Sequence, residues 1–307
     1  MITKQEITYG AFGKCLELSN GIVKLVVTLD FGPRIIRYSF VDGENMLYED
    51  AVKEFGNSHP SIPETYGEGA AWYLYGGHRL WTSPESVPRT TYPDNDPVGY
   101  TLTDSGAVFA PPVQKCNNYG MEIAVALAED STDVTISHRI TNYGLWPVTL
   151  APWTVTVLST GGTEVLPQPT VDTGLLPNRK IAFWPYAKLT DERLTLLDRY
   201  IVLQQKNMDV KFKMGINSQH GCGLYFNHGE VFVKKYEPVP GGDYPDGGVS
   251  LETYTNKAYV EMESLGEFAT LATGEFTEFT ESWSLAKAEL PALTDEALDK
   301  AVAEYVR

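Results

Sequence analysis

Eleven consecutive residues, 75–85, bring together most of the groups that a sugar-binding site requires. The segment reads YGGHRLWTSPE and carries the imidazole of His78, the guanidinium of Arg79, the indole of Trp81 and the carboxylate of Glu85. A sugar presents hydroxyl groups to charged side chains and an apolar ring face to an aromatic ring. The segment therefore predicts hydroxyl recognition and stacking, and the alternative is a surface turn with an incidental histidine.

Further carboxylates fall on alternating strand patterns near the C-terminus. Over residues 258–263 the alternation puts Glu261 and Glu263 on one face, which either faces solvent or lines a ligand-binding surface. Over residues 279–285 Glu281 shares a side with aromatic and aliphatic residues, so it needs a partner or a ligand. In residues 231–236, Lys234 faces inward if the strand is central and is solvated otherwise.

The composition favours a neutral small-molecule partner. The chain has 24 basic and 40 acidic residues, a formal net charge of −16, and no lysine- or arginine-rich run. Nucleic acid and anionic membrane surfaces are therefore disfavoured as partners. Nucleotide-binding, serine-hydrolase and zincin motifs are absent, so we expect no cofactor.

Cysteine and histidine usage indicates neither a disulfide framework nor a metal site. The three cysteines form no CxxC pair, and the spacing of the five histidines supports no metal ligation. The N-terminus lacks the pattern of a signal peptide, and no window is apolar over the length of a membrane span. We therefore expect a cytoplasmic protein.

Strand signals dominate the chain, which predicts an all-β fold. Period-two alternation and turn residues predict strands at 23–29, 35–40, 99–103, 106–114, 121–129, 133–142 and 147–158. Residues 50–75 and 82–99 lack periodicity and flank the sugar-site segment as long loops, which are often functional. One helix is expected at 294–307, capped by Thr294, within a single domain spanning 1–307. On the strand at 133–142, His138 shares the apolar face and is interpreted as a hydrogen-bonded core residue.

Five stretches of the sequence resemble a bacterial branch of the galactose mutarotase-like superfamily. They are GGHRLWTSPE at 76–85, TLAPWT at 149–154, GGDYPDGG at 241–248, LETYTN at 251–256 and EMESLG at 261–266. The resemblance implies a large twisted antiparallel β-sandwich, the supersandwich, that binds a carbohydrate on the concave face of one sheet.

The resemblance also implies site residues for an aldose 1-epimerase. In those enzymes a glutamate takes the proton of the anomeric hydroxyl while a histidine protonates the ring oxygen, and the sugar opens and recloses. The run LATGE at 271–275 is similar to the family pattern around the base, which makes Glu275 the candidate, with Glu263 as the other. His78 would be the acid or an orienting group, because Trp153 stands where the acid histidine is expected.

The sequence thus predicts catalytic roles for His78, Glu263 and Glu275 and no metal. The predicted substrate-binding residues are Arg79, Trp81, Glu85, Trp153, Lys234, Glu252, Glu261 and Glu281. Two alternatives to an epimerase remain open at this stage: a carbohydrate-binding protein without catalysis, and a lyase or hydrolase acting on an oligosaccharide.

Overall fold

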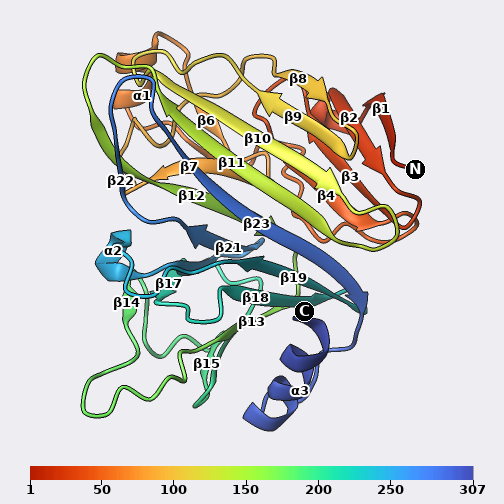
Figure 1. Cartoon of the computed structure of the whole chain (residues 1–307), viewed down its shortest axis with the longest axis vertical. Helices are drawn as coiled ribbons and strands as arrows, with labels where there is room; N and C mark the ends of the chain where they lie inside the picture. Colours follow the sequence, from red (N-terminus) through yellow and green to blue (C-terminus); the bar gives the residue numbers. More distant parts are fainter. Residues whose placement is uncertain (307) are drawn as a thin grey trace.

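Two large antiparallel β-sheets lie face to face in the computed structural model, which describes residues 1–306 (Figure 1). In the view of Figure 1, β10 (Tyr119–Leu127), β11 (Val134–Asn142) and β23 (Phe276–Lys287) cross in front of β7 (His78–Ser83) and β12 (Val148–Leu158). Alternate residues of β10 and β11 are buried, as expected for strands with one face on a core. The fold is therefore all-β, as the alternating pattern predicted, and its two sheets form the sandwich that the family resemblance implied.

The sheet that carries the sugar-site segment is called sheet I. In spatial order its strands are β1 (Thr3–Thr8), β2 (Lys14–Ser19), β3 (Val23–Thr28), β4 (Ile35–Phe40), β7, β12, β21 (Val260–Leu265), β20 (Leu251–Thr255), β17 (Phe212–Ile216) and β14 (Ile181–Phe183), with β22 (Ala269–Leu271) paired to β12.

The opposing sheet is called sheet II. Its strands in spatial order are β15 (Leu194–Leu196), β16 (Tyr200–Gln204), β13 (Thr163–Pro167), β18 (Cys222–Asn227), β19 (Glu230–Tyr236), β23, β11, β10, β9 (Gly106–Ala110) and β8 (Gly99–Leu102). A small separate pair is formed by β5 (Gly56–Asn57) and β6 (Trp72–Tyr73), and the short helical elements are η1 (Gly10–Phe12), α1 (Ser61–Tyr66) and α2 (Pro245–Gly248).

The predicted strands are confirmed to within a few residues. The ranges expected from alternation correspond to β3, β4, β8, β9, β10, β11 and β12. The segment at 78–83 is itself a strand, β7, placed between β4 and β12 in the middle of sheet I. Because a strand alternates its side chains, neighbouring residues of the sugar-site segment point to opposite faces of sheet I.

Two glycines let the chain enter β7 against its neighbours. Gly76 and Gly77 both have positive φ, at +92° and +64°. A Cβ on Gly76 would lie 2.0 Å from the carbonyl oxygen of Tyr48, and one on Gly77 would lie 2.3 Å from that of Ile35. These glycines therefore fix the position of His78 and the residues that follow it.

The C-terminal helix α3 (Asp295–Tyr305) braces the outside of sheet II. Thr294 caps it by accepting a hydrogen bond from the backbone N–H of Ala297, as predicted. Leu298 and Ala301 are buried in a cluster with β13, β16, β18 and β19, at the lower end of the molecule in Figure 1. The last residue of the predicted range, Arg307, lies outside the described residues.

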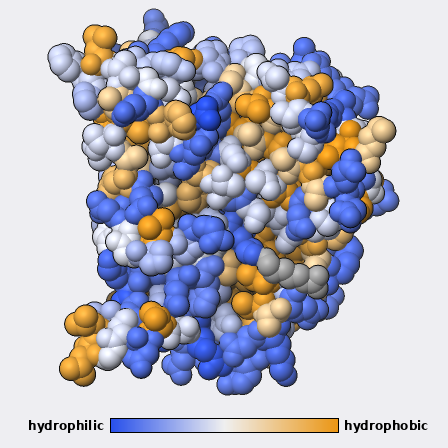
Figure 2. All heavy atoms as spheres, in the orientation of Figure 1, coloured by the Kyte–Doolittle hydropathy of each residue, from blue (hydrophilic) through white to orange (hydrophobic). Residues whose placement is uncertain are grey.

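The molecular surface is mixed, with apolar side chains scattered among polar ones on the face shown (Figure 2). One apolar group at the lower left lies where Figure 1 draws the loop between β13 and β14, in which Leu175 and Leu176 are exposed. Within residues 1–306, none of the helices has the length and apolarity needed to cross a membrane.

Candidate functional site

One row of side chains crosses the middle of sheet I on the face that points away from sheet II. Cross-strand pairing aligns Arg79 of β7 with Val155 of β12, Val155 with Glu263 of β21, and Glu263 with Glu252 of β20. We call this the outer row. Its members are nearly or completely buried. The prediction that Glu261 and Glu263 share a face is met, since both project from β21 on this outer side.

A lysine that the sequence analysis did not single out joins the carboxylates of the outer row. Lys213 Nζ, on β17, lies 2.8 Å from Glu252 Oε2 and 2.8 Å from Glu263 Oε2. The indole Nε1 of Trp153 donates a second hydrogen bond to Glu263 Oε2, at 2.8 Å. The Lys213 ammonium also lies between the rings of Trp153 and Trp184, at 4.6 and 4.7 Å from their centroids.

Arg79 forms the other end of the outer row. Its Nη2 donates to Glu261 Oε1 at 3.1 Å, and its guanidinium carbon lies 4.1 Å from the Trp81 ring centroid. Trp72, from the loop-borne strand β6, lies 5.3 Å from the same guanidinium carbon. The contacts of Trp81 and Trp153 are thus with the two cations, and these tryptophans, 9% and 4% exposed, are part of the wall of the site.

Burial changes the ionisation of the site carboxylates. Desolvation raises the pKa of Glu252 to about 8, although the adjacent Lys213 ammonium opposes the shift. Desolvation likewise raises the pKa of Glu261 to about 7, against the attraction of Arg79. The pKa of Lys213 is raised well above its usual value, because the charges of Glu263 and Glu252 outweigh desolvation. Two protonatable carboxyls therefore lie beside a carboxylate that accepts two strong hydrogen bonds.

Several buried polar atoms of this region have no hydrogen-bond partner within residues 1–306. They include the acceptors Glu252 Oε1 and Glu263 Oε1 and the donors Arg79 Nε, Arg79 Nη1 and Trp72 Nε1. A buried polar atom without a partner costs about 1–3 kcal/mol, so native proteins satisfy nearly all of them. Their concentration on one face of one sheet is the pattern expected where a polar ligand completes the hydrogen bonding.

His78 lies on the opposite side of sheet I, in the interior between the sheets. It is fully buried, and its Nε2 lies 2.7 Å from Nε2 of His138 on β11 and 3.6 Å from Glu281 Oε1 on β23. Lys234, on β19, is also buried there, with Nζ 3.2 Å from Glu281 Oε2. The structure therefore separates His78, Lys234 and Glu281 from the outer row by the thickness of sheet I, which corrects the expectation that they meet one sugar.

The interior cluster forms one directed chain of hydrogen bonds. His138 Nδ1 must donate to the carbonyl oxygen of Phe279, at 2.9 Å, so its Nε2 is the acceptor and His78 Nε2 the donor. His78 Nδ1 then accepts from Thr156 Oγ1, at 2.9 Å, and Thr156 Oγ1 accepts from Lys234 Nζ, at 3.0 Å. The interpretation of His138 as a hydrogen-bonded core residue agrees with this network.

Three residues of this cluster, His78, His138 and Glu281, are close enough to hold a metal ion. The chemistry of the surroundings does not fit one. Lys234 already neutralises Glu281, and a divalent ion would leave an excess positive charge in a dry interior. Each imidazole nitrogen also has a partner in the chain of hydrogen bonds, which accounts for the short contact between the rings.

The buried histidines should contribute a sensitivity to mild acid. Desolvation lowers the pKa of both, and for His78 the charge of Lys234 and, more weakly, those of Arg79 and Arg34 act in the same direction. Below about pH 6.5 the unfolded chain then binds more protons at these two histidines than the folded chain does, so their contribution to the free energy of unfolding falls as the pH falls, whereas Glu252 and Glu261, with raised pKa values, contribute in the opposite direction. Between pH 6.5 and 5.5, urea unfolding should show that the free energy of unfolding changes with pH by about 1 kcal/mol per pH unit less towards acid loss in His138→Asn than in the wild type.

The exposed His220 supplies the control for that measurement. His220→Asn should keep the wild-type pH dependence. Equal slopes in the wild type and in His138→Asn would contradict the assignment of a neutral His138.

Glu275 lies in an exposed turn between β22 and β23, apart from both clusters. Its Oε2 accepts a hydrogen bond from the backbone N–H of Ala272, at 2.8 Å, as in an ordinary turn. The structure thus does not bring Glu275 to His78 or to Glu263. Among the other predicted residues, Glu85 is exposed beyond the end of β7, at the rim of the outer row. Partial burial raises the pKa of Glu85, and the charges of Lys213 and Arg79 oppose the shift.

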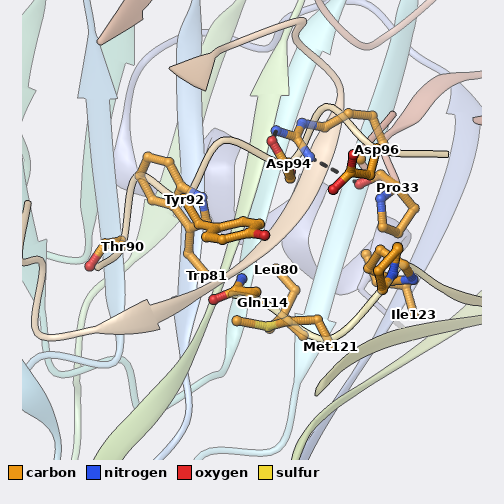
Figure 3. A pocket seen from close by; sticks show the side chains of 14 residues that line it. Pro33, Leu80, Trp81, Thr90, Tyr92, Asp94, Asp96, Gln114, Met121 and Ile123 are labelled. Carbon is orange, nitrogen blue, oxygen red and sulfur yellow. Dashed lines mark hydrogen bonds and ion pairs between the residues drawn. The ribbon is translucent and has the colours of Figure 1, made fainter. Parts of the chain in front are cut away.

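A separate cavity lies beside Trp81 between the ends of the two sheets (Figure 3). It has a volume of about 30 Å³ and is lined by Arg34, which is paired with Asp94, and by apolar residues including Met121 and Ile123. This volume is about the share of one water molecule in the liquid, so the cavity is too small for a sugar. This cavity is therefore excluded as a sugar site.

Comparison with known proteins supports the fold. The sequence matches no protein-family model and no curated protein. Among solved structures, the chain is similar to a TPR-domain containing protein from Parabacteroides distasonis ATCC 8503, with a TM-score of 0.61 and 14% identity over 90% of this chain and 48% of that one. The chain thus spans about half the length of that protein.

Two further solved structures match over their full length. A galactose mutarotase-like protein from Lactobacillus casei ATCC 334 gives a TM-score of 0.58 at 9% identity over 89% of this chain and 100% of that one. A protein from Escherichia coli K12, provisionally named an aldose 1-epimerase, gives a TM-score of 0.55 at 11% identity over 94% of this chain and 100% of that one. At these identities the likeness establishes the fold, and the resemblance seen in the sequence is confirmed at that level: the sandwich is galactose mutarotase-like.

Proposed function

We propose that the protein binds a monosaccharide against the outer row of sheet I and interconverts its anomers by acid–base chemistry. The observation that carries this proposal is the convergence of unpartnered donors at Arg79 and unpartnered acceptors at Glu263 and Glu252 on one buried face. A sugar hydroxyl donates and accepts at once, so one ring can satisfy both kinds of atom.

The spacing of the outer row suits one sugar ring. Adjacent strands are about 4.8 Å apart, so the Cα atoms of Arg79 and Glu263, two strands apart, are separated by about 10 Å along the row, and the Arg79 guanidinium reaches across β12 to Glu261. Val155 lies between them and has no polar group, so a ring above it can reach a charged residue on either side.

The carboxyl groups supply an acid and a base. Lys213 and Trp153 both donate to Glu263 Oε2, an arrangement suited to a charged carboxylate, so Glu263 can take the proton of the anomeric hydroxyl. Glu261, whose pKa is about 7, carries a proton in part of the molecules at neutral pH and can protonate the ring oxygen. The ring then opens, C1 rotates, and closure with the reverse proton transfers gives the other anomer.

Access to the outer row requires the segments above it to move. The unpartnered atoms are shielded from solvent, and the shielding comes partly from irregular chain. Trp184 lies over Lys213, and Asp246 accepts a hydrogen bond from Ser83 Oγ at 3.2 Å. Asp246 belongs to the turn α2, in which it, Gly247 and Gly248 all have positive φ. A turn that is tied to β7 through the hydrogen bond between Ser83 and Asp246 is suited to opening for a ligand.

Binding without turnover is the second candidate function. It is favoured by the position of His78 and His138, which face the interior and so cannot donate a proton to a sugar on the outer row. Calorimetric titration with common aldoses, together with polarimetry of α- and β-glucose and galactose, separates the two. If a sugar binds but its anomers interconvert no faster than in buffer, the second candidate function is supported. If no sugar binds, both candidate functions are contradicted.

The indole N–H of Trp72 offers a selective probe of the ligand contact. Trp72→Phe keeps an aromatic ring beside Arg79 but removes a donor that has no partner in the described chain. Loss of one hydrogen bond of about 1 kcal/mol should weaken sugar affinity about five-fold in the calorimetric titration. Trp146→Phe, at an exposed turn, is the control and should bind as the wild type does. Equal affinities in both variants would place the sugar elsewhere.

A further inference from the structure

The outer row and its rim hold more carboxyl groups than cations. The carboxyl groups are Glu85, Asp246, Glu252, Glu261 and Glu263, and the cations are Arg79, Lys213 and Lys180, whose ammonium lies beside Gly248 of α2. Arg79 is already paired with Glu261, and Lys213 with Glu252 and Glu263. A ligand that brings a negative charge would therefore add to an acidic surplus, whereas a positive charge would reduce it.

The positions of the unpartnered acceptors show where a positive charge would be held. Lys213 contacts the Oε2 atoms of Glu252 and Glu263 and leaves the Oε1 atom of each without a hydrogen-bond partner in the part of the chain that the structure describes. Both glutamates are 1% exposed, so water does not compensate these atoms as it would at the surface. An ammonium group carries three donors and makes the stronger, charge-assisted kind of hydrogen bond to such oxygens.

The unpartnered donors lie at the opposite end of the outer row. Arg79 Nε and Nη1 and Trp72 Nε1 need acceptors, which hydroxyl and ring oxygens provide. The site is thus complementary to a ligand with a cationic donor at one end and neutral oxygens at the other. A phosphorylated sugar or a sugar acid has the wrong charge for the glutamate end.

We propose that the monosaccharide bound at the outer row is an amino sugar, with its protonated amine against Glu252 Oε1 and Glu263 Oε1. This inference rests on the proposed function, because it places a sugar at the same row. It goes further by naming the class of sugar and the residues that select it. Lys213 sets the distance between the two glutamates, and Arg79 and Trp72 bind the hydroxyl end.

Calorimetric titration of the wild-type protein at pH 7 tests the proposal with glucosamine, galactosamine, glucose, galactose and N-acetylglucosamine as probes. At least one amino sugar should bind about ten-fold or more tightly than its parent sugar, as expected for a hydrogen bond to a charged group. N-acetylation, which removes the charge, should abolish the preference. Glucose 6-phosphate and glucuronate should bind more weakly than glucose.

Two variants test which residues cause the preference for amino sugars. A bound ammonium group favours the charged form of Glu252, whose pKa is about 8 without it. Glu252→Gln keeps the shape of the side chain but cannot become a carboxylate, so it should bring the affinities for glucosamine and glucose close to one another. Glu85→Gln, at the exposed rim, should partly reduce the ratio of the glucosamine affinity to the glucose affinity. Because this change does not disturb a buried contact, it replaces Glu252→Gln as the test if that variant does not fold. Glu122→Gln, on the outer face of sheet II, is the matched control and should keep the wild-type ratio.

The outcomes separate this inference from the function on which it rests. If neither glucosamine nor galactosamine binds more tightly than its parent sugar, the amino-sugar inference is overturned and the sugar site is left standing. A preference that survives N-acetylation or the Glu252→Gln change would overturn it as well. If none of the sugars in the panel binds, both the inference and the proposed function are overturned.

Discussion

Replacing Glu263 by glutamine is expected to lower kcat/KM for anomer interconversion by about two to four orders of magnitude, the usual contribution of a general base. Glutamine keeps the size of the side chain and can still accept hydrogen bonds from Lys213 and Trp153, which hold Glu263 at 2.8 Å each. It cannot take a proton from the anomeric hydroxyl. The substitution therefore removes the base and leaves the surrounding contacts in place.

The rate is measured by polarimetry on a freshly dissolved pure anomer, normalised to folded protein. Glu275→Gln provides the matched control, because Glu275 is exposed and the one side-chain hydrogen bond found for it within residues 1–306 is to the backbone N–H of Ala272 in its own turn. Its rate should stay within about three-fold of the wild type. A strong loss in Glu275→Gln with little loss in Glu263→Gln would refute the assignment of the base to the outer row.

Replacing Lys213 by methionine should destabilise the fold by about 3–5 kcal/mol, the range for breaking a buried ion pair by removing one partner. The ammonium of Lys213 is the cation shared by Glu252 and Glu263, both of which are 1% exposed. Without it, two carboxylates face each other in a dry environment, and their charged forms become costly.

Urea unfolding of Lys213→Met gives both the size and the pH dependence of the effect. The carboxyls should be protonated more readily in the folded variant than in its unfolded chain, so the loss should be largest above neutral pH and should shrink as the pH falls towards 5. Lys206→Met, which removes an exposed pair with Glu192 at 3.4 Å, should change stability by less than about 1 kcal/mol. Similar losses in both variants would show that Lys213 does not compensate a buried charge.

Much of the fold could be predicted from the sequence because alternation is a local property. The strand at Ile35–Phe40 and those that became β8 to β12 followed from period-two patterns bounded by turn residues. The helix α3 followed from the cap at Thr294 and the stripe that includes Leu298. The arrangement of the sheets themselves came from the family resemblance and could not be obtained from these local signals.

The composition of the site was harder to predict because the sugar-site segment is a strand and not a loop. Arg79 and Trp81 point to the outer face of sheet I. His78, which directly follows the two glycines, points to the interior. If the motif is treated as one unit, His78, Arg79 and Trp81 are all assigned to the same ligand. Side chains adjacent on a strand, however, point to opposite faces. The same rule separates Lys234, on the inner side of β19, from the residues on the outer side of sheet I.

Residues brought together by cross-strand register were the ones missed. Lys213 lies in the stretch VKFKM, which looks like a surface strand with solvated lysines until β17 is placed beside β20. Trp72 comes from the long loop before β7, where no period indicates its direction. The aligned residues Glu252, Glu263 and Val155 are far apart in the chain, so only the pairing of β12, β21 and β20 shows that they form one row.

The position of a bound sugar tests the central claim most directly. A crystal structure of the protein grown with a saturating concentration of the tightest sugar in the calorimetric panel should show the ring above Val155, with Arg79 on one side and Glu263 on the other. A sugar ordered at any other surface, with the outer row unchanged and its polar atoms still without partners, would contradict the account.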